Sequence, residues 1–447
     1  MKPLDTLLQA LVAALALAAQ PLAAAPASGD PSFPTAVSLV RVSPQWNDPA
    51  VALVGLPAIR SGVIRFAADE VLYEGTAPAV RPLVKSSTYL PDSVDTFTFF
   101  EKDHERLNYD LIAGEELLFV GRDPRGNQGI FHCSSNKLIH AWVPAGAQVP
   151  GALERFAKVR YPHGIAGRVA FVGYTAEGRR GVYRASSEGV LERVADTQVT
   201  APGTEVRFTD FSYARLLRDG TVVFTGYSEA GSGIYVAREG QGLVRLIDRQ
   251  TVEPRTKRNY AGVLLVGVED RWAYFTSFGA TLSIGRIQLD GSTLETLVAD
   301  DAIPSLYPER IGAINYASVD HERVLFEAAT HGTDFDIFLW EAGKVRPVVR
   351  HGDLLEGGKV CGLRVGLQGL SGSRFACLLD IRKGEAAPVQ RAVYMGDLSP
   401  AAAQSVGAVA PKASQSRDLI PWLKLGRSPV SVFAREPSQP EGSPSKP

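Results

Sequence analysis

The sequence is poor in the residues and runs that mark several classes of protein. Its 447 residues include only three cysteines, Cys133, Cys361 and Cys377, so disulfides cannot form the main framework. Without a C-x-x-C motif or Cys/His ligand spacing, we expect no metal site. Lys and Arg number 47 and Asp and Glu 48, a formal net charge of -1. This balance supplies no general field for nucleic acid or anionic lipid, so we expect no nucleic-acid partner.

Two of the cysteines, Cys361 and Cys377, fall in segments that we expect to be neighbouring strands. They either form a disulfide in an oxidising compartment or are buried as small apolar side chains. The sequence leaves both alternatives open.

Local catalytic motifs are missing as well. The chain has no G-x-S-x-G phrase, no sialidase-type S-x-D-x-G-x-T-W box and no phosphate-binding loop. We therefore expect no cofactor. Residues that converge from separate repeats leave no local motif, so catalysis is less favoured by the sequence but stays open.

The chain lacks a hydrophobic run long enough to cross a bilayer. The longest N-terminal run, Ala10 to Ala19, follows a single lysine and precedes small residues around Ala23 to Ala27. This order is typical of a cleaved signal peptide over 1–27, and an uncleaved anchor is the alternative. We expect a periplasmic or secreted protein without a transmembrane span after cleavage.

A repeated phrase dominates the rest of the sequence: an apolar run with an aromatic residue, a Gly-rich polar break, and a second apolar run. Successive copies are separated by 53, 52, 53, 51, 51 and 49 residues. The aligned aromatic positions are Phe66, Phe119, Phe171, Phe224, Phe275, Phe326 and Phe375. A period near 50 indicates a propeller or a solenoid.

Each repeat contains four short β-type runs separated by glycine turns, for example "TVVFTG" and "IYVARE" within 221–239. A four-stranded meander of this length is one propeller blade. We expect the phenylalanine to pack against the next blade and the glycine after it to permit a tight exit into the loop. The prediction is an all-β, seven-bladed β-propeller over 36–397, with six blades or an open β array as alternatives.

The two ends of the repeat region carry incomplete patterns. Residues Val37 to Ser43 look like an outer strand that stands before the first complete inner strand, and the last repeat stops after three strands. We expect the N-terminal strand to complete the last blade and close the ring, which would remove both sheet edges. Residues 398–447 are rich in small residues, Pro and Ser, so we expect a linker and a largely disordered tail.

The repeat phrase F-x-G…G-[IV]-[YF], the crossover D-x-x-T/V-x-x-P-G at Asp196 to Gly203 and the signal-like start resemble a group of exported bacterial β-propeller repeat proteins without an assigned activity. The likeness spans about 36 to 397. It implies the fold and export but carries over no catalytic residues. The first two repeats depart from the crossover pattern.

Polar variety gathers in the loops between the second and third strands, which share one face of a propeller with the crossovers. We expect ligand-binding residues there: Arg122, Asp123, Arg125, Arg179, Arg180, Tyr227, Glu229, His331, Asp334 and Asp336. Arginines on adjacent blades could grip carboxylates or sulfates of a glycan, or be solvated.

Asp196, Asp248 and Asp300 recur every 52 residues. Such spacing fits an acidic arc that gathers a cation or a polyhydroxylated ligand. We favour the simpler interpretation, in which each carboxylate accepts backbone N–H bonds and shapes its own turn. Likewise, "DHER" at 320–323 predicts a polar hairpin turn rather than a metal pair.

The function favoured by the sequence is an exported binding or scaffold propeller that recognises a partner protein or a cell-surface glycan through its loop-rich face. The alternative is a propeller-type polysaccharide lyase or glycoside hydrolase, with His331, Asp334, Asp336, Tyr227 and Arg179 as candidate residues. Convergence of these side chains would favour the enzyme, and separate exposure would favour binding.

Overall fold

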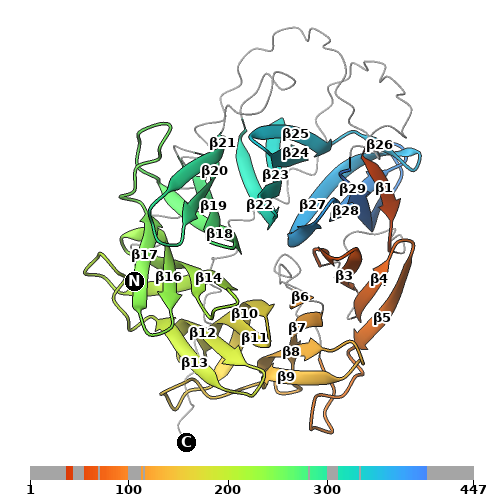
Figure 1. Ribbon diagram of the computed structural model, residues 1–447. Helices are drawn as coiled ribbons and strands as arrows, with labels where there is room; N and C mark the ends of the chain where they lie inside the picture. The colour runs from red at the N-terminus through yellow and green to blue at the C-terminus, as the bar shows by residue number, and fades with distance from the viewer. Residues whose placement is uncertain are drawn as a thin grey trace, which may run out of the picture. The chain divides into compact units, whose positions relative to one another are not determined.

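The computed structural model describes residues 37–43, 55–68, 71–98, 112–113, 116–279, 282–299, 311–331 and 334–399. All of them belong to one compact unit, Pro34–Pro447. The expected signal peptide (1–27), the tail from residue 400 onward, and Asp300 lie outside the described residues. Within the described ranges every regular element is a strand. Figure 1 shows these strands with their labels.

The strands follow one another as four-stranded antiparallel meanders, numbered here in chain order. Meander 1 consists of β2 (Ala58–Arg60), β3 (Val63–Ala68), β4 (Val71–Thr76) and β5 (Ala79–Lys85). Meander 2 consists of β6 (Ile112–Ala113), β7 (Glu116–Arg122), β8 (Gln128–Cys133) and β9 (Ile139–Val143). Meander 3 consists of β10 (Phe156–Ile165), β11 (Arg168–Thr175), β12 (Arg180–Ser186) and β13 (Leu191–Asp196). Meanders 2 and 3 share one sheet through a single parallel pair, Gly164 with Ala113.

The remaining meanders repeat the same order. Meander 4 consists of β14 (Phe208–Leu216), β15 (Val222–Ser228), β16 (Gly231–Arg238) and β17 (Gly242–Asp248). Meander 5 consists of β18 (Gly262–Glu269), β19 (Trp272–Phe278), β20 (Ser283–Gln288) and β21 (Leu294–Ala299). Meander 6 consists of β22 (Ala313–Asp320), β23 (Arg323–His331), β24 (Asp334–Glu341) and β25 (Lys344–Val349). Meander 7 contains β27 (Gly358–Ser371), β28 (Arg374–Arg382) and β29 (Val389–Asp397), with the short β26 (Leu354–Leu355) beside β27.

The fourth strand of meander 7 comes from the other end of the chain. Strand β1 (Ser38–Arg41) pairs antiparallel with β29, from Ser38 opposite Asp397 to Arg41 opposite Tyr394. The hydroxyl of Ser43 then accepts a hydrogen bond from the Val393 amide at 2.9 Å. This is the pairing that the sequence predicts for Val37 to Ser43. It covers the edge of β29 that would otherwise expose a row of unpaired backbone groups.

The first strand of each meander contacts the first strand of the next. Such contacts join β10 with β14, β14 with β18, β18 with β22, and β22 with β27. Strand β27 in turn contacts β2, and β2 contacts β6. Figure 1 shows β10, β14, β18, β22 and β27 on the inner side of their sheets, with β9, β13, β17, β21 and β25 on the outer side.

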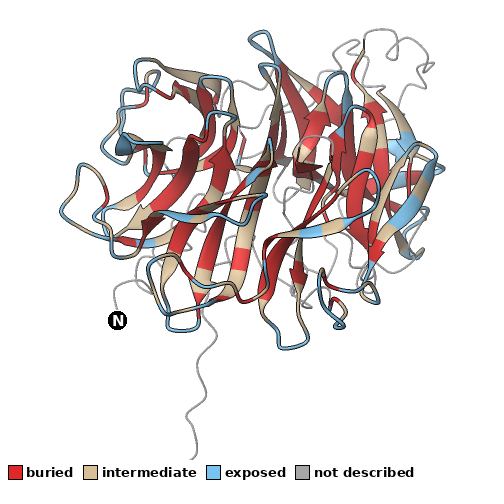
Figure 2. Cartoon of the chain, turned by 60° about the horizontal axis from the view of Figure 1, so that its bottom comes forward, coloured by how far each residue is buried: buried red, intermediate tan, exposed pale blue. Residues whose placement is uncertain are grey.

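Buried residues run along the strands and exposed residues occupy the connecting loops, as Figure 2 shows. The core consists of hydrophobic clusters that span neighbouring meanders. One cluster joins Phe326 and Phe338 of meander 6 to Tyr274 of meander 5. Each meander therefore hides its apolar faces against the next one, which a single meander cannot do alone.

The repeated F-x-G phrase has a packing explanation that differs from the one expected. In meander 2 the ring of Phe97, at the end of the preceding crossover, lies 4.8 Å from the ring of Phe131 and 5.5 Å from that of Phe119. A Cβ added at Gly121 would lie 2.5 Å from the Phe97 ring. The glycine therefore makes room for an aromatic side chain.

The same arrangement recurs in meanders 3 and 4. Phe156 lies against Gly173, and Phe208 lies 2.5 Å from where a Cβ would stand on Gly226. These glycines do not have positive φ angles. The expectation of a tight exit into the loop is therefore wrong for them, because ring packing rather than backbone conformation requires the glycine.

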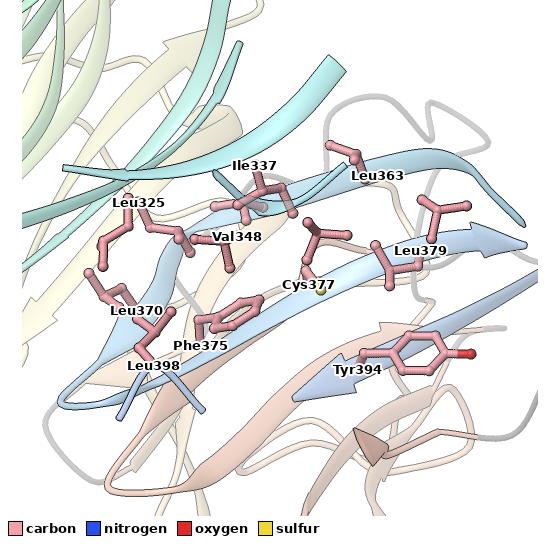
Figure 3. Packing of buried hydrophobic residues seen from close by; sticks show 14 of the residues in the cluster. Leu325, Ile337, Val348, Leu363, Leu370, Phe375, Cys377, Leu379, Tyr394 and Leu398 are labelled. Atoms are coloured by element: carbon pink, nitrogen blue, oxygen red, sulfur yellow. The ribbon is translucent and has the colours of Figure 1, made fainter. Parts of the chain in front are cut away.

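The cysteines of meander 7 are both free. Cys377 is fully buried and lies among Ile337, Val348 and Leu379, as Figure 3 shows. Cys361 lies at a bulge of β27, opposite Asp380 of β28. The register places Cys377 opposite Val365, four residues further along β27, so the strands hold the two thiols apart.

Candidate binding site

The loop residues expected to bind a ligand are largely engaged in shaping their own loops. Asp123 accepts hydrogen bonds from the backbone and the side-chain amide of Asn127, at 2.8 and 3.0 Å. The backbone oxygen of Arg122 accepts a bond from the Thr98 amide at 3.0 Å. Arg125 and Glu229 are exposed to solvent. The contacts described here do not bring Asp123, Arg125 and Glu229 together at one site.

The two neighbouring arginines, Arg179 and Arg180, are held by carboxylates of their own region. The Nε of Arg179 lies 2.6 Å from Glu154, and its Nη1 lies 3.4 Å from the buried Asp196. Arg180 lies 2.7 Å from Asp210 on the next meander. Arg179 therefore ties the β11–β12 turn to the crossovers around it, and Arg180 bridges two meanders.

The recurring aspartates shape turns. Asp196 accepts a hydrogen bond from the backbone N–H of Gln198 at 2.9 Å, and Asp248 accepts one from the backbone N–H of Gln250 at 2.9 Å. An arginine three residues earlier also reaches each carboxylate, Arg193 at 3.0 Å and Arg245 at 2.6 Å. These bonds are the simpler interpretation favoured from sequence, and they leave little capacity for a cation arc.

Asp334 and Asp336 both contact His351, in the turn that follows β25, and so stabilise that turn. The buried Asp336 accepts the His351 amide at 2.7 Å, and the His351 ring lies 3.5 Å from Asp334. The backbone of His331 pairs with that of Asp334, while its side chain lies outside the described residues. The contacts described above do not join Asp334 or Asp336 to Arg179 or Tyr227, so they do not unite the five enzyme candidates.

Tyr227 is the exception, because it belongs to a larger aromatic cluster. Its hydroxyl lies 3.0 Å from the Ser212 hydroxyl on β14. Tyr213 follows Ser212, and its ring lies 4.7 Å from the ring of Tyr161 on β10. We call Tyr161, Tyr174, Tyr213, Tyr227 and Tyr316 the tyrosine cluster.

Three members of the tyrosine cluster stand at bulges of inner strands. The pairing with the second strand is interrupted at Tyr161, at Tyr213 and at Tyr316. Tyr161 and Tyr213 have φ angles of 52° and 50°, which are unusual for bulky residues. Such a conformation costs roughly 1–3 kcal/mol per residue, and it is found mainly where a side chain must be aimed for function.

Burial keeps three phenols of the tyrosine cluster, those of Tyr174, Tyr213 and Tyr227, protonated at neutral pH by raising their pKa. Burial raises the pKa of Tyr213 well above its usual range, and the neighbouring phenols of Tyr161, Tyr316 and Tyr227 raise it further. Burial also raises the pKa of Tyr174 and of Tyr227. The hydroxyls therefore act as hydrogen-bond donors and acceptors at neutral pH, and the rings act as apolar faces.

Arginines flank the tyrosine cluster. The guanidinium of Arg160 lies 5.6 Å from the centre of the Tyr174 ring. Arg180 pairs with Asp210, whose pKa is raised by burial although Arg180 and Arg160 oppose the rise. Arg215 is buried beside Tyr213. Two guanidinium groups, those of Arg160 and Arg180, therefore lie near the Asp210 carboxylate, and a third, that of Arg215, lies beside Tyr213.

A histidine anchors the neighbouring backbone. The Nδ1 of His163 accepts a hydrogen bond from the Leu216 amide at 3.1 Å, across from β10 to β14. Burial, assisted by Arg215, lowers the pKa of His163 to about 3. A neutral imidazole is required for Nδ1 to accept that bond.

One group of described residues has the composition of a metal site: Glu269, Asp320 and His321. Its carboxylates already have partners. Glu269 accepts the backbone amides of His321 and Glu322, and Asp320 accepts the Gly372 amide at 2.6 Å. His321 and Glu322 form the turn between β22 and β23, as "DHER" predicts. The carboxylates thus link the turns of successive meanders.

Sequence reasoning missed most of the tyrosine cluster. Tyr161 and Tyr213 are separated by 52 residues, the same period as the repeat, and that spacing was the available signal. Nothing in the spacing shows that the two rings face each other. The bulges that aim them are visible only in the strand register.

Comparison with known protein families places the sequence. Residues 13–293 match the model of a family of unknown function, DUF7453. The chain belongs to the DUF7453 family. None of the curated proteins matches this DUF7453 member significantly.

Solved structures resemble the DUF7453 chain at low identity. The β-propeller domain of the Trilobed protease from Pyrococcus furiosus has a TM-score of 0.42 and 9% identity, with 75% of this chain and 96% of that one covered. A puromycin hydrolase has a TM-score of 0.43 and 11% identity, with 73% of this chain and 50% of that one covered. Prolyl oligopeptidase B from Galerina marginata has a TM-score of 0.44 and 11% identity, with 78% of this chain and 49% of that one covered. This chain therefore spans about half the length of each of these two proteins. No helix in the described part of the DUF7453 chain has the length and apolarity to cross a membrane.

Proposed function

We propose that meanders 1 to 7 are the blades of one seven-bladed β-propeller, closed by β1. The contact of β27 with β2 and the pairing of β1 with β29 support this arrangement. A further link supports it: the side-chain amide of Gln368 on β27 bonds both the N–H and the C=O of Ile112 on β6, each at 3.0 Å. These three links join the first meanders to the last one.

We propose that the protein binds an acidic glycan at the tyrosine cluster and does not transform it. The observation that carries this proposal is the pair of tyrosines, Tyr161 and Tyr213, whose rings lie 4.7 Å apart and which are held at strained positions on adjacent inner strands. Phenol rings offer apolar faces and hydroxyl groups to a polyhydroxylated ligand. The site thus lies at the inner strands rather than in the loops that the sequence favoured.

The flanking charges favour an anionic ligand. Arg160 and Arg180 lie near Asp210, and Arg215 lies beside Tyr213, so three guanidinium groups flank the tyrosine cluster. Guanidinium groups are suited to carboxylates and sulfates because their N–H donors match the geometry of two acceptor oxygens. The net charge of -1 means that this preference is local to the site.

Binding without catalysis fits the protonation of the cluster better than a lyase or hydrolase does. A general base works best when its pKa lies near the operating pH. Burial moves the pKa of Tyr213 and of Tyr227 upward, away from that range. The contacts described above also do not unite Asp334 and Asp336 with the tyrosines as an acid and base pair.

The test is calorimetric titration of the full chain with hexagalacturonate and with its methyl-esterified, uncharged form. We expect the acidic form to bind at least about tenfold more tightly than the ester, a difference of ~1.4 kcal/mol. Tyr213→Ala and Arg160→Gln should each weaken binding by about tenfold or more. Tyr213→Phe keeps the ring and should lose less.

Arg125→Gln serves as the matched control, because Arg125 is an exposed loop arginine outside the tyrosine cluster. Equal binding of acid and ester, or an unchanged affinity in Tyr213→Ala with a loss in Arg125→Gln, would overturn the proposal. Release of unsaturated or reducing sugar ends during prolonged incubation would instead establish the lyase or hydrolase alternative.

We further propose export to the periplasm or the medium, on the composition of residues 1–27 alone. N-terminal sequencing of the protein recovered outside the cytoplasm should show a start near Ala27. A full-length chain retained in the membrane fraction would contradict cleavage.

A further inference from the structure

A buried carboxyl group lies next to the tyrosine cluster and takes no part in the binding proposed above. Glu327, on β23 directly after Phe326, has no exposed surface. Its Oε1 accepts a hydrogen bond from the Val365 amide on the next inner strand, β27. Its Oε2 is buried without a hydrogen-bond partner among the described atoms. Burying a carboxylate oxygen without a hydrogen bond costs free energy, and the cost is smaller when the carboxyl group is neutral.

Backbone anchoring does not by itself require a glutamate here. Thr225 occupies the same place two repeats earlier, one residue after the aligned Phe224. Its hydroxyl accepts the Leu265 amide of the next inner strand at 2.9 Å. A threonine therefore performs the anchoring with no second oxygen and no titratable proton. The extra oxygen and the proton of Glu327 need another explanation.

The surroundings of Glu327 link two inner strands. Asn315 of β22 lies against the carboxyl group, and Arg364 of β27 is the charged neighbour. Cys377 of β28 faces it from the apolar cluster of meander 7. Burial raises the pKa of Glu327 to about 7, although the Arg364 charge, the hydrogen bond from the Val365 amide and the polar side chain of Asn315 oppose the rise.

Asn315 connects Glu327 to the binding site. Asn315 and Tyr316 are the two residues that leave the register at the bulge of β22. Tyr316 is close enough to influence the protonation of Tyr213. The carboxyl group thus lies behind the bulge that presents Tyr316 to the tyrosine cluster.

We propose that Glu327 is a positioning residue: with its proton it holds the Asn315–Tyr316 bulge in the ligand-binding form, and without its proton it releases that form. This inference rests on the proposed binding function. A neutral carboxyl group tolerates burial, whereas a carboxylate must gain hydrogen bonds or a cation. The nearest side chains that could supply a hydrogen bond or a positive charge are those of Asn315 and Arg364. Bringing either side chain onto the carboxylate would shift an inner strand.

The first experiment measures hexagalacturonate affinity from about pH 5.5 to 8.5, where the ligand stays fully ionised because its carboxyl groups titrate near pH 4. We expect the wild-type affinity to fall about fivefold or more as the pH rises through 7. Glu327→Gln removes the charge and keeps the shape, so its affinity should stay at the low-pH value throughout. A Glu327→Gln profile identical to the wild-type profile would overturn the inference.

Two exposed histidines are controlled separately. His321→Gln and His351→Gln should each keep the wild-type pH profile, because their rings pair with Asp320 and Asp334, which lie outside the tyrosine cluster. Loss of the pH dependence in either variant would assign it to that histidine and refute the role of Glu327.

The second experiment needs no ligand and separates this inference from the binding proposal. The protein is labelled with fluorotyrosine, and the resonance missing in Tyr316→Phe is assigned to Tyr316. We expect this resonance to titrate near pH 7 in the wild type and to stay fixed in Glu327→Gln. A titrating resonance in a protein that binds no hexagalacturonate would sink the binding function and leave the proton-linked bulge standing.

A resonance that does not titrate in the wild type would overturn the inference, whatever the ligand does. If Glu327→Gln does not fold, Glu327→Thr replaces it. This variant copies the arrangement at Thr225 and carries no charge, so it should also show a fixed Tyr316 resonance.

Discussion

At the scale of single residues, the repeat is a set of packing requirements centred on aromatic rings. The glycine of F-x-G is needed because the ring at the end of the crossover occupies the space of a side chain. Substitution there should overpack the core rather than strain a turn. That distinction can be measured.

Gly173→Ala should destabilise the protein by about 1–3 kcal/mol, because the new Cβ would overlap the Phe156 ring. Urea denaturation gives the free energy of unfolding. Gly384→Ala is the control: nothing lies within 4 Å of a Cβ at that site, so its change should stay within about 0.5 kcal/mol. Equal effects at the two sites would contradict the ring-packing explanation.

The protonation of His163 should be visible in the pH dependence of stability. Its folded pKa of about 3 lies below the unfolded value of 6.5, so the unfolded state binds more protons between these values. Stability is therefore lost as the pH falls from about 6.5 toward 3. His163→Gln should flatten this part of the profile, as followed by thermal unfolding at several pH values. A wild-type slope in the variant would exclude His163 as the cause.

At the scale of elements, the inner strands have two features that their sequences do not predict, namely bulges and hydrogen bonds to the neighbouring meander. Bulges at Tyr161, Tyr213 and Tyr316 turn side chains toward one another, and polar side chains from one meander accept the N–H groups of the next inner strand. Gln128 does so for Val159 at 3.0 Å, as Thr225 does for Leu265. Backbone N–H groups of the inner strands thus find partners across the meander boundary.

The pairing of β1 with β29 is the element most open to a direct test. Removing residues 37–43 would uncover the edge of β29 and the part of the apolar cluster that Leu39 covers. We expect a loss of several kcal/mol in the free energy of unfolding and increased self-association. Val40→Thr at an exposed position should change little. A truncated protein that melts like the wild type would show that β1 does not stabilise the unit.

At the scale of the whole molecule, charge is balanced and the proposed preference for acidic ligands is local. Binding should therefore weaken with salt only as far as a few arginines contribute. We expect the hexagalacturonate affinity to fall by roughly tenfold between about 50 and 500 mM salt, because screening reduces charge pairing near the surface. Titration calorimetry at several salt concentrations gives the slope. An affinity independent of salt would contradict recognition of the ligand charges by Arg160 and its neighbours.

Two buried groups, Glu327 and His163, change the pH dependence of stability in opposite directions. Between about pH 4.5 and 7 Glu327 ionises in the unfolded chain but keeps its proton in the folded protein, since its folded pKa is raised, so stability falls as the pH rises through this range. His163 lowers stability as the pH falls below 6.5. Between about pH 4.5 and 6.5 the two slopes have opposite signs, so each is best seen in the difference between the wild type and its own variant.

The sequence by itself determined the all-β class, the period of the repeat, the strands within each copy and the turn role of Asp196 and Asp248. These features depend on local contacts and on alternation along a strand, which neighbours in the chain encode. It also indicated that Val37 to Ser43 is a strand without a local partner, as the pairing with β29 bears out.

Only the tertiary structure indicated the tyrosine cluster as the proposed binding site. Arg179 and Asp336 read as exposed loop groups, but residues of neighbouring crossovers engage them, and Asp123 is engaged by Asn127 of its own loop. Tyr161 and Tyr213 read as ordinary strand residues, but a change of register at a bulge turns them together. Register and the approach of one meander to the next are set by packing between distant segments, and a single sequence carries no separate record of either.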